Sequence, residues 1–301
     1  MTKTRVLGFQ LRPLQSFFRL LACIRFDEVL VLQGAPLIGA LFSITTFSAS
    51  DGFKLAALIA GNLCLVAYVF VLNDWAGIEG DLKDPNRATR TFVANGLSRT
   101  AVGYLALGLL VMSLVIFGLL GSLPLVLGLA IAGLGTLYSA PGFHWKGRPL
   151  LNSALHIGGG ALHFLLGYAT FAALDVGSVG VSSFFGLVFT AGHFTHEARD
   201  HDGDRLNGIR TNAVVLGQIQ AFFLGLALFT VAYALLAVLA LCGFVPFLLV
   251  FTAALYPFHL FASLRAFRSG LTFENLSRLQ RCYRVIYAII GLLMIALVPK
   301  W

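Results

Sequence analysis

The sequence predicts an all-α integral membrane protein in which about nine transmembrane helices form a single bundle. Hydrophobic residues make up 58% of the 301 residues and charged residues only 11%, whereas soluble domains carry about 25% charged residues. Apolar stretches of roughly 20 residues, the length that crosses the hydrocarbon core of a bilayer, recur along the chain. These observations exclude a water-soluble protein. The expected surroundings are a lipid bilayer, and we predict neither a nucleic-acid partner nor a protein partner.

Nine segments are long and apolar enough to cross a membrane. They cover residues 29–49, 54–73, 98–118, 121–140, 150–174, 178–196, 213–239, 244–264 and 281–299. Residues 12–25 precede them and mix Leu and Phe with Arg12 and Arg19. That pattern is typical of an amphipathic helix lying in the membrane interface.

The charged residues are distributed unequally between the two ends of the bundle. Nine spans place the N-terminus and the loops near 74–97, 141–149, 197–212 and 265–284 on one side. That side holds every Lys and Arg except Lys54 and Lys300, so the positive-inside rule turns it toward the cytoplasm. We therefore expect a multi-pass protein with a cytoplasmic N-terminal segment, 1–28, and one transmembrane domain, 29–301.

Acidic residues gather in two loops on the same side, although acids contribute little to membrane topology. The first cluster lies in the stretch VLNDWAGIEGD, residues 71–81, and the second follows the sixth span. In each cluster three residues are spaced so that they share one face of a helix. These sets are Asn73, Gly77 and Asp81, and Glu197, Asp200 and Asp204.

Two such faces opposed across a bundle would bring several carboxylates close together, which is costly unless cations neutralise them. Mg²⁺ is the natural cation because it prefers hard oxygen ligands and is usually shared with substrate phosphates. The candidate metal ligands are Asn73, Asp74, Asp81, Glu197, Asp200 and Asp204.

Basic residues accompany the acids, as expected for a site that holds an anionic diphosphate. The candidates for that contact are Arg87, Arg90, Lys146, Arg148, Arg205 and Arg210. An apolar tail on the diphosphate would then lie within the bundle. The alternative for either loop alone is a solvated surface with incidental salt bridges.

Aromatic and histidine side chains near these motifs could line a cavity for such a tail. They are Tyr68, Trp75, His156, His163, Phe164 and Tyr168. Ordinary packing, or for the histidines a hydrogen bond between helices, would also explain each of them.

At these residues the chain resembles the UbiA superfamily of intramembrane prenyltransferases. Its members have nine transmembrane helices and two motifs, NDxxDxxxD and DxxxD, that bind Mg²⁺ and an isoprenyl diphosphate. Asn73-Asp74…Asp81 matches the first motif except at its middle Asp, and Asp200…Asp204 matches the second. The segment from Tyr138 to Arg148 is similar to the one between the family's fourth and fifth helices. The resemblance therefore adds Tyr138 to the candidate diphosphate contacts and implies that Asn73, Asp81, Asp200 and Asp204 are catalytic.

Gly77 departs from the transferase motif, because glycine cannot ligate a metal. The pattern Asn73-x-x-x-Gly77-x-x-x-Asp81 instead resembles Nxxx(G/A)xxxD, the first motif of UbiA-type terpene cyclases, which retain DxxxD. The leading hypothesis is therefore an Mg²⁺-dependent terpene cyclase that ionises geranylgeranyl diphosphate or a similar substrate, cyclises it and releases diphosphate.

Two alternatives remain open. One is a UbiA-type prenyltransferase that attaches the prenyl group to a small lipophilic or aromatic acceptor; Asp74-Trp75 favours it, since NDW is similar to the chlorophyll-synthase branch. The other is a transporter or a non-catalytic membrane protein, although transporters place polar groups near the bilayer midplane rather than at helix ends.

Overall fold

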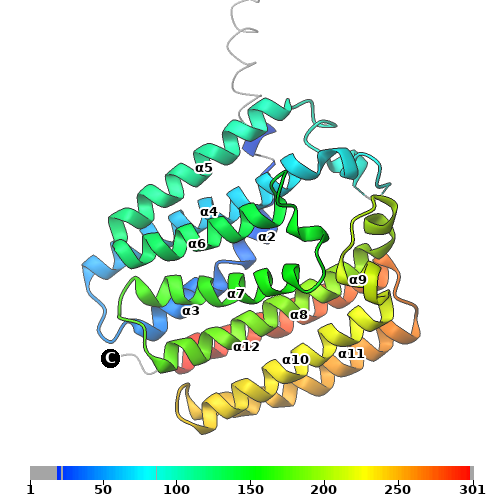
Figure 1. Ribbon diagram of the computed structural model, residues 1–301. Coiled ribbons are helices and arrows are strands. Elements are labelled where there is room, and N and C mark those ends of the chain that lie inside the picture. The colour runs from blue at the N-terminus through cyan, green and yellow to red at the C-terminus, as the bar shows by residue number, and fades with distance from the viewer. Residues whose placement is uncertain (1–18, 22, 86, 299–301) are drawn as a thin grey trace, which may run out of the picture.

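The computed structural model describes residues 19–298 except 22 and 86 (Figure 1). Helices account for all the regular secondary structure of these residues. The amphipathic helix expected over 12–25 lies largely outside the described residues.

The long helices run side by side along one direction of the bundle (Figure 1). The first six are α2 (Phe26–Val31), α3 (Gly34–Ser43), α4 (Ala49–Asp81), α5 (Arg99–Leu120), α6 (Ser122–Ser139) and α7 (Leu151–Ala169). The remaining five are α8 (Val176–Leu206), α9 (Asn212–Leu216), α10 (Gln218–Leu241), α11 (Tyr256–Arg268) and α12 (Phe273–Leu297). Three 3₁₀ helices join them: η1 (Ala88–Arg90), η2 (Trp145–Gly147) and η3 (Phe247–Leu255).

Eight segments of the described chain are long and apolar enough to cross a membrane. The predicted span 150–174 corresponds to α7, which is helical but less apolar because it carries Asn152, His156 and His163. It packs against α3, α6 and α8. The all-α membrane bundle is thus confirmed, whereas the count of nine transmembrane helices stays a prediction.

Helices α4 and α8 are longer than their predicted apolar spans. Each begins at a capping box, formed by Ser48 with Asp51 in α4 and by Asp175 with Ser178 in α8. Each then continues past its apolar stretch, because helical hydrogen bonding does not require apolar side chains. Both acidic motifs therefore lie on the last turns of long helices rather than in loops.

Helix α8 ends immediately after its motif. Gly208 has a φ of 67°, which glycine adopts at little cost. The Ile209 amide donates to the Asp204 carbonyl at 2.9 Å and the Gly208 amide donates to the Arg205 carbonyl at 3.2 Å. This pair of bonds is a Schellman motif, which fixes the end of the helix beside Asp204.

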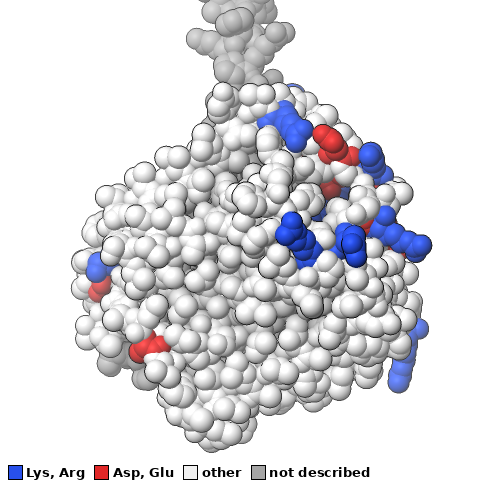
Figure 2. All heavy atoms as spheres, viewed as in Figure 1, with Lys and Arg blue, Asp and Glu red and all other residues white. Residues whose placement is uncertain are grey.

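Charged side chains gather at one end of the bundle, while the middle of the visible face is almost uncharged (Figure 2). The two acidic motifs lie at this end, at the C-terminal ends of α4 and α8.

The backbones of α3 and α7 touch at two glycines. A Cβ atom at Gly39 would lie 2.1 Å from the Phe164 carbonyl oxygen, and one at Gly167 would lie 1.8 Å from the Pro36 carbonyl oxygen. Since backbone cannot yield as a flexible side chain can, any larger residue would push the two helices apart.

We expect Gly167→Ala to destabilise the protein by on the order of 3 kcal/mol, the cost of overpacking a close contact. The matched control is Gly108→Ala on α5, where a Cβ meets nothing within 4 Å. Thermal unfolding in detergent should show a lower midpoint for Gly167→Ala alone. Equal midpoints for the two variants would contradict the close contact.

Candidate active site

A pocket at the charged end is lined by α4, α6, α8 and the segments that follow each of these helices. Asn73, Gly77 and Asp81 face it from α4, and Asp200 and Asp204 face it from α8. The structure thus brings residues of the two motifs together, whereas Glu197 of the second predicted set does not line the pocket.

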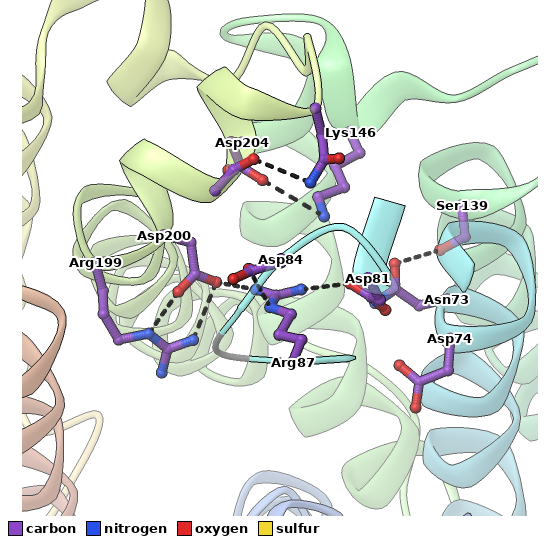
Figure 3. A network of polar contacts seen from close by, with 12 residues as sticks. Asn73, Asp74, Asp81, Asp84, Arg87, Ser139, Lys146, Arg199, Asp200 and Asp204 are labelled. Atoms are coloured by element: carbon purple, nitrogen blue, oxygen red, sulfur yellow. Dashed lines mark hydrogen bonds and ion pairs between the residues drawn. The ribbon is translucent and has the colours of Figure 1, made fainter. Parts of the chain in front are cut away.

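Arg87 links the two motifs through its guanidinium group (Figure 3). Its Nη1 donates to Asp81 Oδ1 at 3.2 Å, and its Nε lies 3.5 Å from Asp84 Oδ2. Its Nη2 pairs with Asp200 on the facing helix. Burial by itself would lower the pKa of the Arg87 guanidinium, but Asp200 and Asp81 outweigh burial and raise that pKa above its ordinary value.

Two further polar contacts complete the wall of the pocket. Lys146 Nζ lies 3.9 Å from Asp204 Oδ1, and Ser139 Oγ donates to Asn73 Oδ1 at 3.4 Å. Tyr138, beside Ser139 on α6, also lines the pocket. Asp200 is held from the other side by Arg199, whose Nε donates to Asp200 Oδ1 at 2.7 Å.

Asp74 lies beside Asn73 in sequence but does not line the pocket. Its carboxylate pairs with Arg25, whose Nε donates to Asp74 Oδ2 at 3.2 Å. In Figure 3 no dashed line joins Asp74 to the Arg87 cluster. In this arrangement the ion pair between Asp74 and Arg25 holds the start of α2 against α4. The role of Asp74 as a metal ligand stays a prediction.

Glu197 is also set apart from the other acids. It is only 4% exposed and does not line the pocket. Its Oε1 accepts from Asn152 Nδ2 at 2.5 Å and its Oε2 accepts from Asn212 Nδ2 at 2.9 Å. These bonds join α7, α8 and α9 behind the pocket, so Glu197 as a metal ligand likewise stays a prediction.

Gly77 leaves open space in the pocket wall. A Cβ atom built there would meet only Asp81 Oδ2, at 3.8 Å, which is ordinary van der Waals contact. Gly77 has a helical backbone conformation, so neither packing nor a special φ explains the glycine.

The candidate bases separate into two groups. Arg87 and Lys146 line the pocket, whereas Arg148, Arg205 and Arg210 are exposed and do not line it. Arg90 lies in η1, and its side chain is outside the described part of the chain.

The candidate cavity residues are scattered. Tyr68 contacts the Thr136 hydroxyl, and the Trp75 indole donates to the Arg99 carbonyl on α5. Phe164 is fully buried against Phe185, and Tyr168 donates to Asp175 at the opposite end of α8. His163 contacts the Gly159 carbonyl within α7. The His156 ring touches a residue of the pocket wall, the Tyr138 ring.

Sequence reasoning did not select several residues that line the pocket. These are Ala76, Gly80, Asp84, Ser139, His144, Gly203, Asn207 and Ile209. A Cβ at Gly203 would lie 2.7 Å from Asp84 Oδ2, so this glycine admits the carboxylate. The signal for Asp84 is its position three residues after Asp81; nothing in the sequence alone indicates its approach to α8.

The pocket fits hydrated Mg²⁺ shared with a phosphate-bearing ligand. No group of three or more His, Cys or acidic side chains in the described part of the chain forms a ready-made metal cage. Mg²⁺ does not need one, because it is usually bound by one or two carboxylates, waters and substrate phosphates. Four carboxylates and two basic side chains line the pocket, so an anionic diphosphate entering it would require additional cations.

Comparisons with known proteins agree with this fold. No curated protein matches the chain in sequence. Among solved structures, a UbiA homologue from Archaeoglobus fulgidus bound to GPP and Mg²⁺ has a TM-score of 0.71 at 16% identity, covering 93% of this chain and 98% of that one. An apo UbiA homologue from Aeropyrum pernix K1 has a TM-score of 0.72 at 19% identity, covering 90% and 98%. A digeranylgeranylglyceryl phosphate synthase has a TM-score of 0.71 at 17% identity, covering 94% and 99%.

These structural matches show a shared fold, while the family is shown by sequence. Residues 35–272 match the UbiA prenyltransferase family. That region contains both acidic motifs and every pocket residue described above. The chain therefore belongs to the UbiA prenyltransferase family.

Proposed function

We propose that the protein is an Mg²⁺-dependent intramembrane terpene cyclase, which ionises a linear isoprenyl diphosphate such as geranylgeranyl diphosphate and cyclises it. The observation that carries the proposal is the composition of the pocket wall on α4. Asn73, Gly77 and Asp81 face the pocket, whereas Asp74, part of the transferase motif, pairs with Arg25. The wall thus presents the Nxxx(G/A)xxxD pattern.

Ionisation requires that negative charge on the departing diphosphate be stabilised. Lys146 and Arg87 supply positive charge from the protein. Mg²⁺, when bound at Asn73, Asp81, Asp200 and Asp204, would supply the rest. The allylic cation that remains needs surroundings without water and with aromatic faces. The apolar bundle beneath the pocket provides such surroundings.

Structural relatives support the substrate class. The A. fulgidus homologue binds GPP and Mg²⁺ in one structure and DMAPP and Mg²⁺ in another. By analogy we propose that an isoprenyl diphosphate and Mg²⁺ bind in the pocket of this chain. The excess of Lys and Arg at the charged end supports the proposal that this end lies on the cytoplasmic side.

The second candidate is a prenyltransferase that moves the prenyl group to a lipophilic or aromatic acceptor. The family as a whole and the likeness to a digeranylgeranylglyceryl phosphate synthase favour it. It shares the ionisation step with the cyclase and differs in requiring a second substrate.

The purified protein should convert geranylgeranyl diphosphate with Mg²⁺, and without any acceptor, to a cyclic hydrocarbon detectable by gas chromatography and mass spectrometry. Chelation of Mg²⁺ should abolish turnover. Asp81→Ala or Asp200→Ala should lower it by about 100-fold or more, because each removes charge from the site of ionisation.

Asp202→Ala is the matched control for these variants. Asp202 lies between the two motif acids in sequence, but its side chain is 98% exposed and it does not line the pocket. It should retain wild-type turnover. Turnover that begins only when an aromatic acceptor is added would instead establish the transferase.

Gly77→Asp should fold normally but form less hydrocarbon or a different one. Its Cβ fits, whereas its carboxylate would compete with Asp81 for cations. Gly77→Ala separates size from charge and should stay closer to the wild type in a parallel product analysis. Faster prenylation of an added acceptor by Gly77→Asp would count against the cyclase.

Arg87→Gln should lower the thermal midpoint in chelator, with a loss of on the order of 2 kcal/mol in the free energy of unfolding, since it removes the cation that lies 3.2 Å from Asp81. Mg²⁺ should then raise the midpoint of the variant more than that of the wild type. Arg278→Gln, which removes an exposed pair with Glu274, is the control and should change little. An equal effect of Mg²⁺ on Arg87→Gln and the wild type would show that Arg87 and the metal do not share these carboxylates.

A further inference from the structure

His156 presents an unprotonated ring nitrogen close to the pocket. Its Nδ1 lies 2.7 Å from the Asn152 carbonyl oxygen. A carbonyl can only accept, so Nδ1 carries the proton in this contact. In neutral imidazole the other nitrogen, Nε2, then has a free lone pair and is the basic atom of the ring.

The His156 ring lies directly behind the pocket wall. It meets the Tyr138 ring edge-on, with centroids 5.2 Å apart, and Tyr138 lines the pocket. On its other sides it contacts Phe189, at 5.4 Å, and stacks on His193, at 3.5 Å. It therefore stands where the charged mouth of the site gives way to the aromatic interior, next to where a prenyl chain would enter the bundle.

The carboxylates in this region are already engaged. Asp81 and Asp200 are bound to Arg87, and Asp204 is paired with Lys146. Behind them, both oxygens of Glu197 accept hydrogen bonds from asparagines. The Nε2 atom of His193 lies 3.1 Å from Glu197 Oε1, which directs that nitrogen toward the carboxylate.

We propose that His156 Nε2 accepts the proton whose loss ends the cyclisation; this assignment rests on the proposed function. In that step the C–H bond next to the cationic carbon breaks, and its electron pair forms the new C=C bond. The proton bonds to Nε2, so the positive charge passes from carbon to the imidazolium ring. Transfer of that proton to the released diphosphate restores His156.

The surroundings of His156 suit this role. The faces of Tyr138 and Phe189 stabilise a nearby carbocation before the proton is lost. Afterwards the imidazolium stacks on His193, with the Glu197 carboxylate on the far side of that ring. Without a base at this place, a cation at the mouth of the bundle would persist until water captured it and gave an alcohol.

The experiment compares the wild type with His156→Phe and His156→Gln, using geranylgeranyl diphosphate and Mg²⁺ without an acceptor. Two quantities are measured: the rate of diphosphate release and the ratio of hydrocarbon to alcohol among the products. Loss of a general base costs about 100-fold or more in its own step, so the ratio should fall at least about tenfold, whereas diphosphate release should fall much less.

His259→Phe is the matched control. His259 is a fully buried histidine that packs on Phe229 and Tyr283, apart from the pocket. This variant should keep the wild-type product ratio even if its thermal midpoint falls. Because the ratio is internal to each product mixture, partial loss of folded enzyme does not alter it.

An unchanged ratio in both His156 variants, with hydrocarbon still formed, overturns the assignment and leaves the cyclase intact. The assignment is also overturned if diphosphate release and hydrocarbon formation fall by the same factor, or if both variants fail to fold. In either case His156 would have a structural role. If the wild type turns over only with an acceptor, the proposed function and this assignment fail together.

Discussion

The guanidinium of Arg87, held between carboxylates of α4 and α8, is the interaction on which the arrangement of the site depends. The fold brings acids from two halves of the chain to one pocket, and like charges at such distances repel strongly where water is scarce. Arg87 offsets that repulsion for Asp81, Asp84 and Asp200. Lys146 does so for Asp204. The pocket remains negative, and this excess would favour a divalent cation over a bare anion in the proposed function.

Not every acid of the two motifs serves the pocket. Asp74 holds the start of α2 against α4 through Arg25, and Glu197 ties α7, α8 and α9 together through two asparagines. Both acids hold neighbouring helices together, and these contacts fix the directions of the side chains beside them. With Asp74 turned away, Asn73 and Asp81 form the polar wall of α4, and Gly77 leaves the space between them open.

Much of this architecture could be predicted from the sequence. Apolar length predicted the helical bundle, and helical spacing predicted that Asn73, Gly77 and Asp81 share a face. The predicted apolar spans, 54–73 and 178–196, stop short of the ends of α4 and α8, because hydropathy marks where a helix leaves lipid and not where it ends. Spacing also could not show that Asp74 turns away from the pocket while Asp81 faces it. Asp74 pairs with Arg25, which is distant in sequence, and Asp81 pairs with Arg87, which lies in the turn after α4. The contact between Gly203 and Asp84 likewise arises only when the two halves of the chain meet.

The length of the motif helices has a consequence for how a substrate reaches the site. At 33 residues, α4 is about 50 Å long, roughly 20 Å more than the hydrocarbon thickness of a bilayer. The acids of its motif occupy the last turns, so a bilayer centred on the apolar part of α4 would hold them at the level of the lipid headgroups. A prenyl diphosphate dissolved in the membrane holds its own charged and apolar parts at those same two depths. In the proposed function such a substrate would approach the site by lateral diffusion within the bilayer, and the concentration that governs occupancy would be its surface density in the leaflet.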